Sequence, residues 1–289
     1  MEERKTFHND KGEELYEERE EPFKDLGETL NYLLDLRLHK DEEIENEFWS
    51  FRGHRDKAYK LEVEPRKPDI PNDKIDYNDW FSQYQKRMFD KRELDYLNEK
   101  NLNEKNDWWW LYYARHHNLY TRLLDWTSNP LVAIYFAVEN IQSRGNDKME
   151  GVVWALKVNK EQFYSTEELC EKYKGLDPSN DLKDEKGRAL GEKEWFMINP
   201  EPVTHRIVLQ SSKFSYHPGI NRPDKKPTPI EQMGRRTGEK LIKIKIDPGA
   251  NAKIRKQLGI MNIHHASLFP SPTGIAYFIN SEWPDIAKY

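Results

Sequence analysis

The sequence has a single cysteine, Cys170, among its 289 residues. One cysteine excludes an intramolecular disulfide and a cysteine-rich metal site. The chain also lacks an apolar run long enough to span a bilayer, and its first residues, MEERKTFHND, lack the apolar centre of a signal peptide. We therefore expect a cytoplasmic protein that does not bind a membrane.

Several motifs of common enzyme classes are missing as well. The sequence contains no G-x-x-x-x-G-K-[ST], no G-x-G-x-x-G, no H-E-x-x-H and no G-x-S-x-G. A nucleoside triphosphatase, a Rossmann dehydrogenase, a zincin or an α/β-hydrolase is therefore disfavoured. The adjacent pairs His116–His117 and His264–His265 do not predict a metal site, because neighbours in a strand point to opposite faces.

An excess of charge of one sign is also lacking. The 46 basic residues are balanced by 51 acidic ones, which gives a net charge of -5. This balance removes the broad positive surface of a general nucleic-acid binder but leaves room for a local basic groove. The chain does have 36% hydrophobic and 12% aromatic residues, which is enough to build a folded core at this length.

Charged and apolar residues are unevenly distributed along the chain. Residues 1–26 are strongly charged, and we expect a frayed or partner-bound amphipathic arm there. The next residues, GETLNYLLDLRL, introduce apolar helical spacing, so we expect residues 27–289 to form a single domain. Polar stretches with glycine and proline predict loop insertions near 163–198 and 217–237.

The hydrophobic pattern predicts both strands and helices. A short strand is expected at Phe48–Arg52, broken by Gly53, with a second extended piece near Leu61. Further strands are predicted over 151–158, 204–216 and 239–247, and helices within 77–114 and over 248–258. This order indicates an α+β fold with mixed, mainly antiparallel sheets flanked by helices.

The densest polar chemistry lies in residues 112–138, YYARHHNLYTRLLDWTSNPLVAIYFAV, where it runs directly into an apolar segment. Ser128 or Asn129, followed by Pro130, predicts the start of a buried helix. A buried arginine or aspartate is costly unless it is paired. Arg122 and Asp125 therefore either neutralise each other in a structural network or line a site for a polar ligand, and the sequence leaves both readings open.

Four blocks of the sequence resemble the FRG-domain family and follow that family's order. They are F-R-G at 51–53, H-H-N-L-Y-T-R-L-L-D-W-T at 116–127, R-I-V-L-Q-S-S-K-F at 206–214, and S-L-F-P at 267–270 with Gly274. Three positions depart from the family pattern. Arg115 stands where Gln is common, Asn118 where Gly is usual and Tyr120 where Pro is usual, so the turn into the second block is expected to differ in shape.

FRG domains have been likened to ADP-ribosyltransferases, so the resemblance implies a fold of that kind and a site for NAD. The first-strand arginine of such transferases corresponds to Arg52, whose guanidinium can grip a pyrophosphate bidentately. Gly53 would let the backbone approach the ligand. The alternative for Arg52 is an ion pair with a structural carboxylate.

The resemblance also supplies candidates for the other NAD contacts. Thr121 or Thr127 would take the hydroxyl position, although Thr127 can equally cap the next helix. His116 would bond a ribose hydroxyl, unless it is a satisfied structural residue. Trp126 would stack on nicotinamide or adenine, unless it belongs to the core. Arg122 is counted with them as an NAD-binding residue.

The late-strand position of these transferases is the least well matched. Gln210 is expected on a strand of the right kind, but Ser212 stands two residues on, where the usual Q-x-E pattern has a glutamate. A carboxylate matters because cleavage of the nicotinamide bond passes through an oxocarbenium-like state. Asp125 is the best candidate carboxylate, and Glu201 and Glu231 are weaker ones. Gln210 would then position NAD or the acceptor.

The leading prediction is an NAD-dependent ADP-ribosyltransferase-like toxin of bacterial antiviral defence. It would modify a macromolecule, RNA or DNA in preference to protein, and would be restrained by an antitoxin or chaperone. Trp108, Trp109 and Trp110 are either core residues or a platform on which bases stack. Two alternatives remain: a catalytically silent FRG module that binds nucleotide or nucleic acid and signals to a partner, and a purely structural interaction protein.

Overall fold

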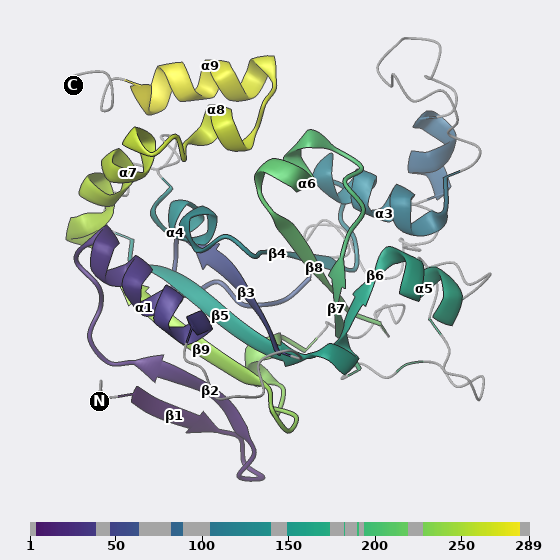
Figure 1. The fold of residues 1–289 in the computed structure, drawn as a ribbon, viewed down its shortest axis with the longest axis horizontal. Coiled ribbons are helices and arrows are strands. Elements are labelled where there is room, and N and C mark those ends of the chain that lie inside the picture. Colours follow the sequence, from purple (N-terminus) through teal and green to yellow (C-terminus); the bar gives the residue numbers. More distant parts are fainter. Residues whose placement is uncertain are drawn as a thin grey trace.

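The computed structural model describes residues 4–38, 47–63, 82–88, 105–139, 149–173, 182, 190, 194–218 and 228–283. Within these residues the fold is α+β, as predicted, with one mixed and mostly antiparallel sheet and helices on its faces (Figure 1). The strands are β1 (Arg4–His8), β2 (Glu14–Arg19), β3 (Glu47–His54), β4 (Leu123–Thr127), β5 (Gly151–Asn159), β6 (Phe163–Ser165), β7 (Phe196–Asn199), β8 (Ser212–Tyr216) and β9 (Lys240–Ile246).

The described helices are distributed between these strands and after them. They are α1 (Leu26–Leu38), α3 (Asp107–His116), α4 (Pro130–Val138), α5 (Thr166–Lys172), α6 (His205–Leu209), α7 (Asn251–Ile260), α8 (His265–Leu268) and α9 (Pro272–Ser281). Residues 82–88 are also helical. Within the described ranges, three short 3-10 turns lie at Lys160–Gln162, Ile230–Gln232 and Pro248–Ala250.

The sheet consists of two halves that meet at a narrow seam. Its strand order is β1-β2-β9-β5-β3-β4-β8-β7-β6. β3 pairs with β5 along its whole length, but it pairs with β4 only through Phe51 and Thr127. β4 in turn pairs with β8 along its whole length. Side chains that follow Phe51 on β3 therefore emerge where the two halves begin to diverge.

Helices α1, α4 and α7 pack on one half of the sheet, and α3, α5 and α6 lie beside the other half (Figure 1). α4 begins where the sequence predicts, since the side chain of Asn129 accepts a hydrogen bond from the backbone N–H of Leu131 and Pro130 is the first helical residue. Its apolar residues join β3, β5 and β9 in one core cluster. Trp108, Trp109 and Trp110 of α3 are buried in a second cluster with β7 and β8, so the interpretation as core residues is confirmed.

Gly53 lies where the backbone of α4 packs closely on β3. A Cβ atom at this position would lie 1.9 Å from the carbonyl oxygen of Ala133 and 2.7 Å from the backbone nitrogen of Ala137. Only a residue without a side chain lets the α4 backbone pack this closely on β3. Gly53 therefore continues the strand, which runs to His54, and the prediction that it breaks the strand is wrong.

The structure corrects the prediction of an N-terminal arm. Residues 4–19 form the hairpin β1–β2, and β2 extends the sheet by pairing in parallel with β9. Charged residues of the hairpin form ion pairs on the sheet: Glu18 of β2 pairs with Lys243 and Lys245 of β9, and Arg4 of β1 pairs with Glu17 of β2. A charged, alternating segment is as compatible with an edge strand as with a frayed arm.

Three further predictions differ from the structure in their secondary structure. The segment 204–216 was expected to be a strand, but its first part is α6, capped by Thr204, and only Ser212–Tyr216 is a strand. The predicted loop insertion near 163–198 contains β6, α5 and β7, with a capping box between Ser165 and Glu168. The region near 217–237 contains a 3-10 turn in its described part, and Leu61 lies in an irregular segment.

Other predictions are confirmed closely. β5 and β9 match the strands expected over 151–158 and 239–247, and Asp247 caps the start of the helical segment that leads into α7. Asn118 has a φ of 64°, which explains why it can stand where the family pattern has glycine: asparagine tolerates the left-handed region better than most residues. No helix in the described ranges has the length and apolar character needed to cross a membrane.

Candidate functional site

Three arginines and one aspartate from four different elements gather at the seam of the sheet. Arg115, at the end of α3, grips both carboxylate oxygens of Asp125 on β4, with 3.0 Å from Nε to Oδ2. Arg52 on β3 donates from Nη1 to the backbone carbonyl of Asp125 at 2.5 Å, and the same Nη1 lies 3.7 Å from Oδ2. Arg206 of α6 adds a third positive charge that acts on Asp125. We call these four residues the arginine cluster.

The arginine cluster carries more positive than negative charge and is open to solvent. Within the cluster three guanidinium groups share the carboxylate of Asp125, and the carboxylate of Glu139 also acts on Arg206 from outside the cluster, so positive charge is in excess. The side chains of Arg52 and Arg115 are each 21% exposed, and that of Asp125 is 35% exposed. A partly exposed group of arginines that their own carboxylate does not neutralise is suited to an anionic ligand.

Asp125 remains ionised in this environment. Burial alone would raise the pKa of its carboxyl group, but the charge and hydrogen bonds of Arg115, with Arg52 and Arg206, hold that pKa well below its usual range. Burial also lowers the pKa of Arg52 to about 10, against the opposing effect of Asp125. Both groups therefore keep their charges at neutral pH, and Asp125 is too weak a base to take up a proton there.

Arg206 is held in place by a residue that the sequence singled out. It donates from Nη1 to the backbone carbonyl of His116 at 2.9 Å, and its guanidinium lies 4.5 Å from the ring centre of Phe269. The ring nitrogen Nδ1 of His116 lies 2.8 Å from the hydroxyl of Thr204, the residue that caps α6. His116 is thus a buried link between α3 and α6, rather than an exposed side chain ready for a ribose.

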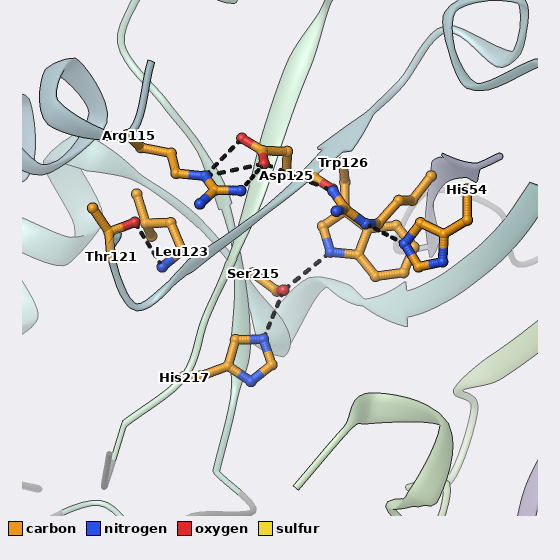
Figure 2. A network of polar contacts seen from close by, with 9 residues as sticks. His54, Arg115, Thr121, Leu123, Asp125, Trp126, Ser215 and His217 are labelled. Carbon is orange, nitrogen blue, oxygen red and sulfur yellow. Dashed lines mark hydrogen bonds and ion pairs between the residues drawn. The ribbon is translucent and has the colours of Figure 1, made fainter. Parts of the chain in front are cut away.

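Three other candidates have partners away from the arginine cluster. Thr121 is fully buried and accepts a hydrogen bond from the backbone of Leu123. Arg122 is fully buried and donates to the hydroxyl of Tyr216. Trp126 is buried on the face of β4 opposite to Asp125, where its indole nitrogen donates to Ser215, which also bonds His217. Figure 2 shows this chain of contacts separate from Arg115 and Asp125. We do not include these three residues in the site.

Gln210 and Thr127 also have structural partners. Gln210 is the C-cap of α6 and not a strand residue, and its amide donates to the carbonyl of Leu268 at 3.0 Å. The hydroxyl of Thr127 donates to the backbone carbonyl of Gln210 at 2.7 Å and accepts from the backbone of Asn129. The weaker carboxylate candidates lie on other segments, and Glu231 accepts from the backbone N–H of Leu61.

Sequence reasoning found two members of the arginine cluster and missed the functional meaning of the other two. Arg52 and Asp125 were predicted as site residues and do lie together. Arg115 was noted only as a departure from the family pattern, although it stands ten residues before Asp125 and makes the closest contact with it. Arg206 lies in the third sequence block, where the pattern predicts a strand, and that prediction hides the fact that α6 directs Arg206 back toward α3.

Burial lowers the pKa of His54, His116 and His217 to about 3 in each case, with further lowering from Arg52 at His54 and from Arg206 at His116. A histidine in the unfolded chain has a pKa of about 6.5, so the unfolded state binds more protons below that pH. The stability that these neutral histidines contribute is present in full above about pH 6.5 and is lost as the pH falls toward 3.

We therefore expect the free energy of unfolding to decrease between about pH 6.5 and 4.5, by up to about 1.4 kcal/mol per pH unit for each of the three histidines. Urea unfolding at a series of pH values measures this slope. His116→Gln should make the slope shallower, because it removes one of the three buried histidines. An unchanged slope in His116→Gln would contradict the assignment of a neutral, buried His116.

Comparison with known proteins addresses the central segment of the chain. Residues 47–146 match the family model of the FRG domain. Neither the curated proteins nor the solved structures contain a significant match to the chain. The matched residues include Arg52, Arg115 and Asp125 and end before Arg206, so α6 completes the arginine cluster from outside the matched segment. The match supports assignment of residues 47–146 to the FRG-domain family.

Proposed function

We propose that the protein binds NAD through its pyrophosphate at the arginine cluster and transfers ADP-ribose from it to a macromolecule. The observation that carries this proposal is the convergence of Arg52, Arg115 and Arg206 on a single carboxylate at a solvent-accessible seam. Guanidinium groups match phosphate oxygens in geometry as well as charge. The excess of positive charge on the cluster suits the negative charge of a pyrophosphate.

In the proposed reaction, the bond between the ribose C1′ and the nicotinamide nitrogen breaks, and nicotinamide leaves with the bonding electrons. An acceptor atom forms the new bond to C1′ and loses its proton to solvent. Asp125 would act by its negative charge, which stabilises the oxocarbenium-like state, since its low pKa makes it a poor general base. The arginines would position the pyrophosphate and thereby the ribose.

RNA or DNA is the proposed acceptor, in preference to protein. The support is the excess positive charge of the arginine cluster, which attracts a phosphate backbone. The tryptophans of α3 do not support a nucleic-acid acceptor, because their side chains are buried and cannot stack on bases. From the resemblance to FRG domains, the proposal further includes a toxin role in bacterial antiviral defence, an antitoxin or chaperone that restrains it, and action in the cytoplasm.

A second candidate is a catalytically silent FRG module that binds a nucleotide and signals to a partner. Two observations favour it: Asp125 already accepts three hydrogen bonds from Arg115, and Gln210, at the position expected to contact the substrate, is buried against Leu268. Such a module would bind NAD or a related nucleotide at the same arginines and leave it intact.

Purified protein incubated with NAD labelled in both the nicotinamide and the adenylate part distinguishes the two candidates. The transferase releases nicotinamide and passes the adenylate label to RNA, DNA or protein supplied in separate reactions. Release of nicotinamide without transfer indicates hydrolysis of NAD. Binding of NAD by calorimetry with neither release nor transfer supports the silent module, and the absence of binding contradicts both.

A further inference from the structure

His54, two residues after Arg52 on the same strand, forms a hydrogen bond with the Arg52 guanidinium. Nε of Arg52 donates to Nε2 of His54 at 2.9 Å. On its other side, Nδ1 of His54 lies 3.2 Å from the backbone carbonyl of Tyr59. His54 is 5% exposed, so solvent does not replace either contact.

These two partners fix the protonation state of His54. The arginine Nε–H can only donate, so Nε2 of His54 must be the accepting nitrogen. The carbonyl of Tyr59 can only accept, so Nδ1 must carry the proton. A neutral imidazole with its proton on Nδ1 satisfies both, and burial, reinforced by the charge of Arg52, lowers the pKa of His54 to about 3. The ring therefore keeps one tautomer across the physiological pH range.

The contact with His54 also determines which edge of the Arg52 guanidinium remains for a ligand. Nε is occupied by His54, and Nη1 donates to the backbone carbonyl of Asp125. No described residue accepts a hydrogen bond from Nη2. With two of its three nitrogens held, the guanidinium plane cannot rotate, and Nη2 is the nitrogen left for a ligand.

We infer that His54 is a positioning residue of the anion site, which holds Arg52 so that the Nη2 side of its guanidinium meets the ligand phosphate. This inference rests on the proposed function, because it assigns a role within the same site. The loop after β3 takes part in it, since the carbonyl of Tyr59 sets the tautomer that lets His54 accept. An arginine that is already oriented loses less side-chain entropy when it binds a phosphate.

The test compares His54→Leu with His54→Gln in the full chain. Leucine fills a similar volume but cannot accept from Arg52, whereas the glutamine amide can accept from Arg52 through its oxygen and donate to Tyr59 through its nitrogen. We expect His54→Leu to bind NAD and inorganic pyrophosphate about tenfold more weakly by calorimetry, the loss of one oriented charge-assisted contact. His54→Gln should recover affinity to within about threefold of the wild type.

The readouts separate positioning from a general packing role. In turnover, we expect His54→Leu to raise KM and leave kcat nearly unchanged, because binding and not the chemical step is affected. Nitrogen NMR should find the His54 proton on Nδ1 at both pH 8 and pH 6. Equal affinity of His54→Leu and wild type, or a proton on Nε2, would overturn the inference, as would a failure of His54→Gln to recover affinity in a folded protein.

The outcome for His54 can be read independently of the transferase reaction. If the wild type binds pyrophosphate but does not cleave NAD, the transferase proposal fails while the comparison of His54 variants still decides the positioning role. If the wild type binds neither NAD nor pyrophosphate, both are overturned. Arg55→Ala serves as a control, because Arg55 lies on the same loop and contacts Tyr59 but not Arg52.

Discussion

Arg52→Ala is expected to reduce NAD-dependent transfer by roughly a hundredfold or more in a protein that still folds but melts at a lower temperature, because His54 and the carbonyl of Asp125 lose their donor. The guanidinium supplies a charge-assisted contact that no other residue of β3 can replace, so its loss weakens the grip on the pyrophosphate. The fold tolerates the change because Asp125 keeps its contacts with Arg115. The measurement is the rate of label transfer from NAD, paired with a melting curve.

Two control variants test whether the loss of activity is specific to the guanidinium of Arg52. Arg55→Ala removes the same charge from the neighbouring loop and should retain activity. Arg52→Lys keeps the charge but loses the planar fork and the Nε contact with His54, so we expect it to recover only a minor part of the lost activity. A folded Arg52→Ala protein with wild-type activity would remove the central claim of the proposed function.

Gly53→Ala is expected to destabilise the protein by about 3 kcal/mol or more, although the added group is a single methyl. The methyl carbon would lie 1.9 Å from the carbonyl oxygen of Ala133, and the clash involves α4 backbone, which cannot move aside as a flexible side chain can. Relief requires that α4 shift away from β3. Chemical denaturation of the purified variant measures the loss.

The matched control for Gly53 is Gly27→Ala in α1. A Cβ at Gly27 would lie 3.1 Å from a carboxylate oxygen of Asp25, which a small rotation of that side chain relieves. We expect its stability to stay within about 1 kcal/mol of the wild type, because alanine also favours the helix. Comparable effects of the two substitutions would show that the close packing of α4 on β3 is not what Gly53 provides.

The elements predicted best from the sequence are those whose signals are local. Asn129 and Pro130 mark the start of α4, and period-two alternation gives β5 and β9, because each signal depends on neighbouring residues only. The hairpin β1–β2 was missed for the opposite reason. Its place in the sheet depends on pairing with β9, more than two hundred residues away, and its charges are neutralised there.

The residues of the candidate site also divide into those that a local sequence motif predicts and those that only the three-dimensional structure reveals. Arg52 and Asp125 could be found because each lies in a compact motif. Thr121 and Trp126 share a motif with Asp125, but strand alternation and the entry into β4 bury them away from Arg115. Arg206 and His54 become functional candidates only when distances are known, since no sequence pattern states which nitrogen of Arg52 meets a histidine.

The single residue pair between β3 and β4 has a consequence for how a ligand would act on the whole molecule. Backbone hydrogen bonds do little to join the two halves of the sheet, so their cohesion depends on the side chains and helices that cross the seam. Arg52 belongs to one half, whereas Asp125, Arg115 and Arg206 belong to the other half and its helices. An anion bound by these arginines would contact both halves of the sheet and restrain their motion relative to each other. Binding of a ligand would therefore make the whole fold more rigid.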